Sequence, residues 1–219
     1  ARQSGYEEAI QVFRRCEPTD PEFRELLSAE LLRKAISDSN AVAHETGCSM
    51  AVAGLESCDL RDGIKCKNAL FDAIVEKCIS SSRIGTRTKG IELVILFVEL
   101  EGKADAIVDA LGPYFDNKSP KVVAGCVESL RRVLKEFGSQ VVDIKQLLRL
   151  MPKLFSHSDK TVRQEAYDLA VEIHRWNDKC ISSIHGQLKP VQVKEIQTLV
   201  ENVMVHDKPE PIRFPRNKK

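Results

Sequence analysis

Residues 81–90 read SSRIGTRTKG and combine two glycines, three cations and several hydroxyl side chains. Such a composition suggests phosphate binding, because a P-loop uses the pattern G-x-x-x-x-G-K-[ST] between a buried strand and a helix. Gly85 and Gly90 have the required spacing, but Ile91 and Glu92 stand where the lysine and the hydroxyl residue belong. The preceding residues, NALFDAIVEKCI, have a helical pattern rather than a strand pattern. We therefore do not expect this segment to bind a nucleotide.

Two pairs of residues have types that bind metal ions. His44 and Cys48 stand one helical turn apart, and His174 stands four residues before Asp178. A closed metal site needs four ligands, and neither pair has two further ligands beside it in the sequence. The sequence therefore predicts no metal site and no other cofactor.

Catalytic and base-stacking arrangements are also missing from the sequence. It contains no nucleophile elbow, no carboxylate pair with a positioned base and no serine with a plausible triad, so we do not expect an enzyme. Trp176 falls on an apolar helical stripe and is expected in the core. The three tyrosines, Tyr6, Tyr114 and Tyr167, show no arrangement for stacking on single-stranded nucleic acid.

The composition is that of a soluble globular protein. Of the 219 residues, 42% are hydrophobic and 30% charged, and the formal net charge of +1 argues against a protein that coats nucleic acid. No apolar run approaches the roughly 18 residues of a membrane span. Seven cysteines occur without a C-x-x-C pair, which favours a reducing, intracellular compartment.

Apolar residues recur with a helical period along most of the chain. A helix at 121–137 is predicted to start after Ser119 as N-cap with Pro120 in its first turn, and one at 161–176 has Ser158 as a candidate cap. LGPYF, EFGSQ and LMPKLF are interpreted as breaks. The other predicted helices are 3–16, 22–36, 41–55, 64–79, 87–100, 104–115, 144–155 and 190–204.

The polar turns of these helix pairs lie near residues 40, 85, 119 and 160. Their spacing of roughly 35–45 residues is typical of two-helix HEAT or armadillo repeats. The sequence thus predicts an all-α HEAT-repeat solenoid over residues 1–205. Residues 206–219, rich in proline and cations, are predicted to form an extended linker.

Equivalent turns of a solenoid line up along one edge. With few acids nearby, the predicted edge is cationic and fits an elongated acidic partner surface. Its residues are Asn40 and Val42, then Arg83, Arg87 and Lys89, then Lys118 and Lys121, then Lys160 and Arg163.

Several segments resemble a known family. SGYEEAIQVF, SDSNAVAHETG, GIELVILFVELEG, LGPYFDNKSPKVVAGCVESLRRVLKEFGS and LMPKLFSHSDKTVRQEAYDLAVEIHRW closely resemble a TOG domain of the ch-TOG-type microtubule polymerases, and the first domain of that family's array in particular. LKPVQVKEIQ and PIRFPR resemble the segment after that first domain.

The resemblance implies a flat paddle of six HEAT repeats whose turns bind the curved, unpolymerised αβ-tubulin dimer. It implies a monomeric, non-enzymatic module at microtubule plus ends, the cytoplasm, the spindle, its poles and the kinetochore, without membrane or nucleic-acid partners. The implied contacts are Asn40, Ala41 and Val42; Arg83 and 86–89, with Thr86, Arg87 and Lys89; Lys118, Pro120 and Lys121; and Lys160, Arg163 and Glu165.

One departure from the family concerns the first repeat. The family carries a tryptophan before the S-G-Y-E-E-A run, whereas the given sequence starts at Ala1, just past that position. The resemblance therefore implies that the first repeat is incomplete here. Two alternatives stay open: a generic HEAT scaffold for another acidic protein, and a module of the CLASP type that binds the microtubule lattice.

Overall fold

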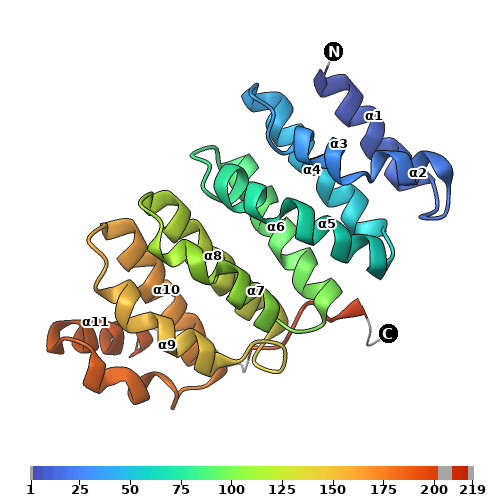
Figure 1. Cartoon of the computed structure of the whole chain (residues 1–219). Helices are drawn as coiled ribbons and strands as arrows, with labels where there is room; N and C mark the ends of the chain where they lie inside the picture. The colour runs from blue at the N-terminus through green and yellow to red at the C-terminus, as the bar shows by residue number, and fades with distance from the viewer. Residues whose placement is uncertain (1, 202–208, 217–219) are drawn as a thin grey trace. The chain divides into compact units, whose positions relative to one another are not determined.

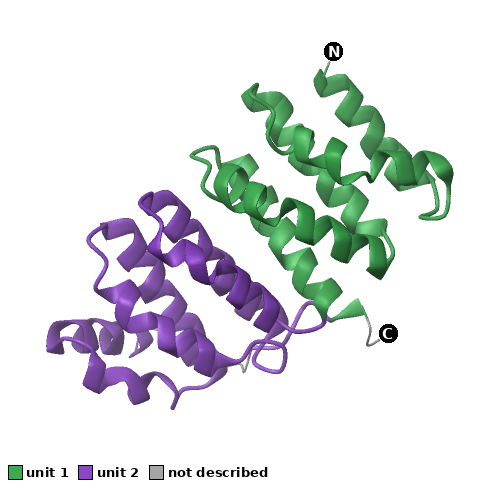
Figure 2. Cartoon of the chain, in the orientation of Figure 1, with its two compact units in different colours: residues 1–101, 215–219 green, residues 102–214 purple. Residues whose placement is uncertain are grey.

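The computed structural model describes residues 2–201 and 209–216, and every regular element in them is helical (Figure 1). These residues form two compact units, which Figure 2 colours separately. Unit 1 comprises Ala1–Glu101 and Pro215–Lys219, and unit 2 comprises Gly102–Phe214. The prediction of an all-α fold is confirmed.

Unit 1 consists of two packed layers of helices. In one layer, α4 (Ala41–Ser57) lies between α1 (Arg2–Arg15) and α6 (Ile84–Glu101). The other layer contains α3 (Ala29–Ala35) and α5 (Leu60–Ala73), and α5 continues into the π-helical turn η1 (Ile74–Ile79). A short helix, α2 (Pro21–Leu26), follows α1. Aliphatic and aromatic side chains from both layers are fully buried and form the core, which burial of apolar surface stabilises.

Unit 2 repeats this helix-pair arrangement. Its central helix α10 (Lys160–Trp176) packs on α8 (Pro120–Phe137), α9 (Ile144–Phe155) and α11 (Pro190–Glu201). The remaining elements are α7 (Asp105–Leu111) with the 3-10 turn η2 (Gly112–Asp116), and the 3-10 segment η3 (Ile181–Gln187).

Some helix boundaries differ from the predicted ones. The single helix expected at 22–36 is broken at Leu27 and Ser28, because the Ser28 hydroxyl accepts the Leu31 N–H and starts α3 there. LMPKLF is not a break: α9 runs through Pro152 because residues on both sides of it are buried against neighbouring helices. The cap of α10 is Asp159 rather than Ser158, since the Asp159 carboxylate accepts the Thr161 and Val162 N–H groups.

Other predicted boundaries hold. α8 begins at Pro120 after the N-cap Ser119 and ends at Gly138, which lies in EFGSQ and has φ of +74°. LGPYF interrupts the α-helix, since α7 ends at Leu111. The predicted helix 190–204 is seen up to Glu201, and its last three residues lie outside the described part of the chain.

Residues 209–216 make specific contacts although they contain no α-helix. In unit 2 the N–H groups of Ile212 and Arg213 both donate to the Glu136 carbonyl, and the Arg213 guanidinium pairs with the Glu136 carboxylate at 2.8 Å. In unit 1 the Arg216 guanidinium donates to the carbonyls of Leu55 and Cys58 near the end of α4. The linker prediction did not include these contacts.

None of the helices within the described residues combines the length and the apolar character needed to span a bilayer.

Candidate functional site

The candidate residues lie in four segments, each of which comprises a turn and the first residues of the long helix that follows it. Unit 1 contains the turns before α4 and α6, and unit 2 contains the turns before α8 and α10. We call residues 38–42 and 80–89 the unit 1 turns, and residues 117–121 and 156–165 the unit 2 turns. Because α4 packs against α6 and α8 packs against α10, the two turns of each unit belong to neighbouring helices.

The turn before α4 is fixed by side-chain capping. The Asn40 amide oxygen accepts the N–H groups of Val42 and Ala43 at 3.1 and 3.0 Å. The Asp38 carboxylate accepts the Asn40 N–H, which lowers the pKa of that carboxyl. Ala41 and Val42 remain exposed, and Val42 is one of the few large apolar side chains on the surface, with 45% of it accessible. The turn therefore presents a small apolar contact on a rigid backbone.

In the segment at the start of α6, two of the three cations, Arg83 and Arg87, make contacts within the protein. The Arg83 guanidinium forms an ion pair with Glu45 of α4, which joins the two unit 1 turns. The Arg87 guanidinium donates to the Ser81 carbonyl at 3.2 Å. Lys89 is half-buried, whereas Ile84 is 70% exposed. Ile84 is not among the predicted contacts, because an apolar residue in a cationic segment gives no charge signal, but its side chain is exposed beside them.

The prediction that Thr86 contacts the partner is wrong, because this residue is buried. Only 1% of this residue is accessible, and its hydroxyl is buried without a hydrogen-bond partner. Its place in the first turn of α6 directs the side chain into unit 1, so Thr86 cannot contact a partner on this surface.

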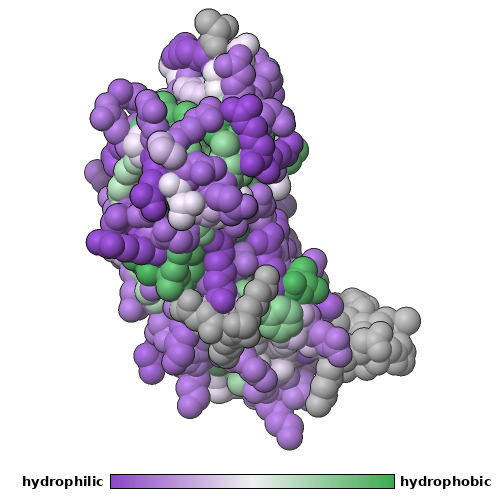
Figure 3. Space-filling model, turned by 90° about the vertical axis from the view of Figure 1, so that its right-hand side faces the viewer, coloured by the Kyte–Doolittle hydropathy of each residue, from purple (hydrophilic) through white to green (hydrophobic). Residues whose placement is uncertain are grey.

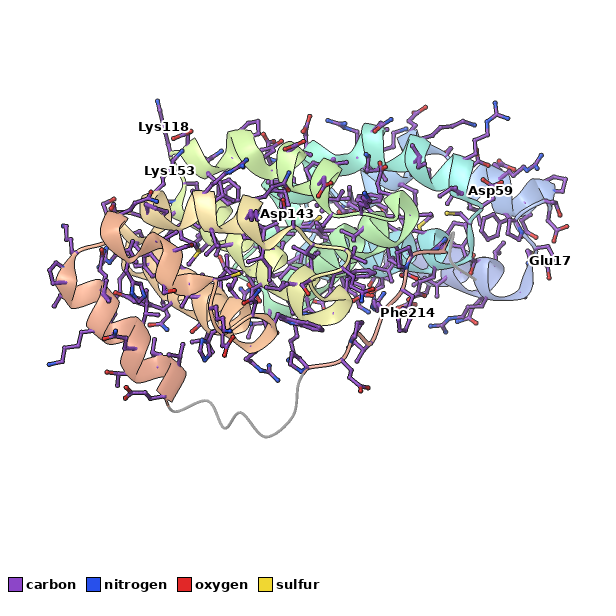
Figure 4. The ribbon with its side chains drawn as sticks, turned by 90° about the horizontal axis from the view of Figure 1, so that it is seen from below. Glu17, Asp59, Lys118, Asp143, Lys153 and Phe214 are labelled. Atoms are coloured by element: carbon purple, nitrogen blue, oxygen red, sulfur yellow. The ribbon has the colours of Figure 1, made fainter. Side chains whose placement is uncertain are left out.

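The turn before α8 is the most open of the four. Lys118 and Lys121 are exposed, and Pro120, half-buried, is the first residue of the helix. Figure 4 shows Lys118 projecting away from the ribbon, with Lys153 nearby. Lys153 pairs with Asp116 at 2.6 Å, whereas Lys118 forms no ion pair within the described residues. A free ammonium group at this position is available to an acidic partner.

At the start of α10, Lys160 is an exposed cation, whereas Arg163 and Glu165 form hydrogen bonds within the protein. Lys160 is exposed and, across residues 2–201 and 209–216, has no ion-pair partner. The Arg163 guanidinium donates to the carbonyls of His157 and Ser158 at 2.7 and 2.6 Å. Glu165 accepts two hydrogen bonds from the Arg131 guanidinium, and burial raises the pKa of the Glu165 carboxyl. Arg163 and Glu165 thus position the turn.

Large apolar side chains are scarce on the described surface. The face seen in Figure 3 is mostly hydrophilic with small apolar patches. The exposed large apolar residues are Val42, Ile84, Val191, Ile212 and Phe214. The four segments therefore offer charged groups and a few apolar side chains, and no broad hydrophobic patch within the described residues.

The structure also decides among the other candidate residues. Residues 84–101 are α-helical and follow the helical segment 60–79, so the helical flanks that argued against a P-loop are confirmed. Trp176 is half-buried: its indole N–H donates to Glu172, and its ring lies against Gly138. His174, of the second candidate ligand pair, has a buried Nδ1 without a hydrogen-bond partner.

The first ligand pair gains a third member in the structure. Cys78, at the end of η1, places its sulfur 3.5 Å from the Cys48 sulfur and 3.7 Å from the Nε2 atom of His44. The hydrogen bond between the two thiols lowers the pKa of Cys48 to about 6, while that bond and burial raise the pKa of Cys78. Cys78 stands 30 residues from Cys48, so residue spacing within one segment does not predict that the two sulfurs meet.

Comparison with known proteins identifies the family. The model of the XMAP215/Dis1/CLASP TOG domain matches residues 1–200, which include helices of both units. The chain belongs to this TOG domain family. Its predicted HEAT-repeat solenoid class is thereby confirmed, because solved TOG domains share its fold.

Relatives of this TOG domain include large spindle proteins. Mini spindles of Drosophila melanogaster is 34% identical over 98% of the chain, and the spindle pole body component alp14 of Schizosaccharomyces pombe is 32% identical over 97%. The chain spans only 10% of Mini spindles and 26% of alp14. It therefore corresponds to one part of much longer proteins of the microtubule polymerase family.

Two solved structures show the shared fold. One concerns tubulin recruitment and assembly by microtubule polymerases with TOG domain arrays; it matches 99% of this chain and 46% of its own at 25% identity, with a TM-score of 0.84. The other, Drosophila melanogaster Mini spindles TOG3, is 19% identical with a TM-score of 0.81, covers 97% of this chain and 92% of its own, and supports the fold alone.

Proposed function

We propose that this TOG domain binds the soluble, curved αβ-tubulin dimer through the unit 1 turns and the unit 2 turns. The observation that carries the proposal is the set of exposed side chains in these segments: Val42 in unit 1, and Lys118 and Lys160, which have no ion-pair partner among the described residues, in unit 2. The likeness to a structure concerned with tubulin recruitment supports tubulin as the partner.

Charge and rigidity have separate roles in this proposal. Exposed lysines accelerate encounter with an acidic surface and favour one orientation of the partner. Capping by Asn40 and Asp159, together with the Arg163 contacts, holds the turns in place before binding, so less conformational entropy is lost on association. Val42 supplies apolar burial at the contact.

Polymerase activity would belong to the parent protein. Several such domains joined by linkers would raise the local tubulin concentration at a microtubule plus end, in the cytoplasm and at the spindle. We propose that this domain is the first of that array and that the chain around residues 206–219 leads towards the next. Assembly is accelerated in this proposal without covalent chemistry, by a monomeric module.

Charge reversal at exposed turn residues tests the proposal. Lys118→Glu/Lys160→Glu should weaken tubulin binding by about tenfold or more, because two attractive contacts become repulsive. Val42→Glu should weaken it similarly by placing a charge at an apolar contact. Binding is measured by gel filtration and by titration with purified tubulin at low and moderate salt.

The matched controls are Lys145→Glu and Val191→Glu, which change exposed side chains outside the turns. All variants should keep the unfolding free energy within about 0.5 kcal/mol of the starting protein. Unchanged tubulin affinity in the folded turn variants would rule out this surface. A failure to form any one-to-one tubulin complex would favour a generic scaffold, and a preference for stabilised microtubules over free dimers would favour a lattice-binding module.

A further inference from the structure

Beneath the unit 1 turns lies a cluster of three side chains with ligand-type atoms. His44 and Cys48 come from successive turns of α4, and Cys78 comes from the end of η1. The three ligand atoms all lie within 4.8 Å of one another. Both cysteines are completely buried, and His44 is half-buried. His44 is therefore the one member of the cluster with a solvent-accessible side chain.

Two of the three separations match those of ligands around one tetrahedral metal ion, and all three are within 4.8 Å. Zn²⁺ binds sulfur at about 2.3 Å and imidazole nitrogen at about 2.0–2.1 Å with tetrahedral geometry. Those bond lengths place two sulfurs about 3.8 Å apart and a sulfur and a nitrogen about 3.6 Å apart. The observed separations are 3.5 Å between the Cys48 and Cys78 sulfurs and 3.7 Å between Cys78 and the His44 Nε2 atom.

Apolar packing does not account for this arrangement. A buried cysteine such as Cys126 behaves as a small apolar residue and needs no polar neighbour. In the cluster, an imidazole nitrogen instead faces a buried sulfur, which in turn lies 3.5 Å from the Ile36 carbonyl oxygen. A sulfur–sulfur distance of 3.5 Å is far longer than a disulfide bond, so both thiols are present in reduced form.

We propose that His44, Cys48 and Cys78 bind a thiolate-preferring divalent metal ion of the Zn²⁺ class. Two thiolates and a neutral imidazole are the ligands that such ions select over carboxylate-preferring Mg²⁺ or Ca²⁺. Binding releases the two thiol protons to solvent and leaves the ion charge balanced by the two thiolates.

The location gives the ion a structural consequence. His44 and Cys48 lie two and six residues after residue 42, and Cys78 lies two residues before residue 80. A bound ion would therefore cross-link the two unit 1 turns, in addition to the Arg83–Glu45 ion pair. The site itself does not depend on tubulin binding and can be tested without it.

Co²⁺ serves as the spectroscopic probe, followed by displacement with Zn²⁺. The reduced, metal-free 219-residue chain should bind one equivalent of Co²⁺ with a thiolate-to-cobalt charge-transfer band, and Zn²⁺ should abolish that band. Cys48→Ala and Cys78→Ala should lose the band, and His44→Gln should weaken Co²⁺ binding by at least about tenfold. The matched controls Cys66→Ala and Cys126→Ala each remove a buried thiol elsewhere and should keep the band.

A second measurement covers the case in which a variant does not fold. At a urea concentration that makes buried thiols of the metal-free chain reactive, Zn²⁺ should slow the alkylation of Cys48 and Cys78 but not that of the equally buried Cys126, as read by mass spectrometry. The proposal is overturned if the unaltered chain gives no charge-transfer band, if the band persists in folded Cys48→Ala/Cys78→Ala protein, or if protection falls on other cysteines.

Discussion

Thr86 and Gly138 are two residues whose roles depend on what surrounds them. Thr86 stands in a cationic turn, yet its hydroxyl is buried without a partner. Gly138 ends α8 with φ of +74°, a backbone conformation that residues with a Cβ seldom adopt. A Cβ at Gly138 would lie 2.6 Å from the Trp176 ring. Each residue leads to a prediction about stability.

Thr86→Val should raise the unfolding free energy by about 1 kcal/mol, because it replaces an unsatisfied buried hydroxyl with a methyl group of similar size. It should leave tubulin affinity unchanged, since the side chain is not accessible. Urea denaturation and tubulin titration measure the two effects. Thr88→Val, at an exposed position in the same turn, is the stability control and should change little. A loss of tubulin binding in folded Thr86→Val would contradict the assignment of Thr86 to the interior.

Gly138→Ala should lower the unfolding free energy by about 2 kcal/mol or more, through the left-handed backbone and the collision with Trp176. Thermal and urea denaturation measure this loss. Gly112→Ala is the matched control in the same unit: its φ is −46° and nothing lies within 4 Å of the added Cβ. It should leave stability unchanged or slightly higher. Equal losses in both variants would mean that the Gly138 environment has no special effect.

At the scale of elements, helix capping determines how firmly each turn is held. Asn40 and Asp159 cap α4 and α10 through their side chains. Ser119 occupies the cap position of α8 but makes no side-chain capping hydrogen bond. Each of the three helices therefore has a polar residue at its N-cap, but only α4 and α10 have a side-chain capping hydrogen bond there.

Asn40→Ala should cost about 1 kcal/mol of unfolding free energy, because two N–H groups at the start of α4 lose their acceptor. Ser119→Ala is the comparison and should cost clearly less. Amide hydrogen exchange at the start of α4 and of α8, with denaturation of each variant, measures the difference. Losses of the same size would show that the observed capping bonds do not decide helix stability here.

At the scale of the whole molecule, the family match covers residues in both units, and the proposed contacts come from both. If one tubulin dimer contacts both units, the effects of distant substitutions on the binding free energy should add.

The variant that combines Val42→Glu with Lys118→Glu/Lys160→Glu should therefore lose affinity by the product of the two separate fold-changes. It should not show only the larger of the two fold-changes. Tubulin titration of the single-unit variants and of the combined variant measures this, and Lys145→Glu/Val191→Glu is the combined control. A combined variant that binds no more weakly than the weaker of its parents would show that only one unit contacts tubulin.

The sequence by itself determined the local features of this protein. Apolar periodicity predicted most of the helices, proline at position 120 the start of α8, and glycine at position 138 its end. Helix periodicity, helix starts and helix ends depend on residues that are close together in the sequence. The helix-pair repeat and its turns could therefore be predicted from the sequence. Residues such as Lys118 and Lys160 are exposed as expected because they sit at those turns.

Only the tertiary structure decided how individual side chains in the turns are used. It pairs Arg83 with Glu45 and Glu165 with Arg131, and it buries Thr86. It also brings Cys78 to His44 and Cys48, which stand 34 and 30 residues away in the sequence. These partners come from neighbouring helices, and their meeting depends on how the helices pack, which residue type and spacing within one segment do not specify.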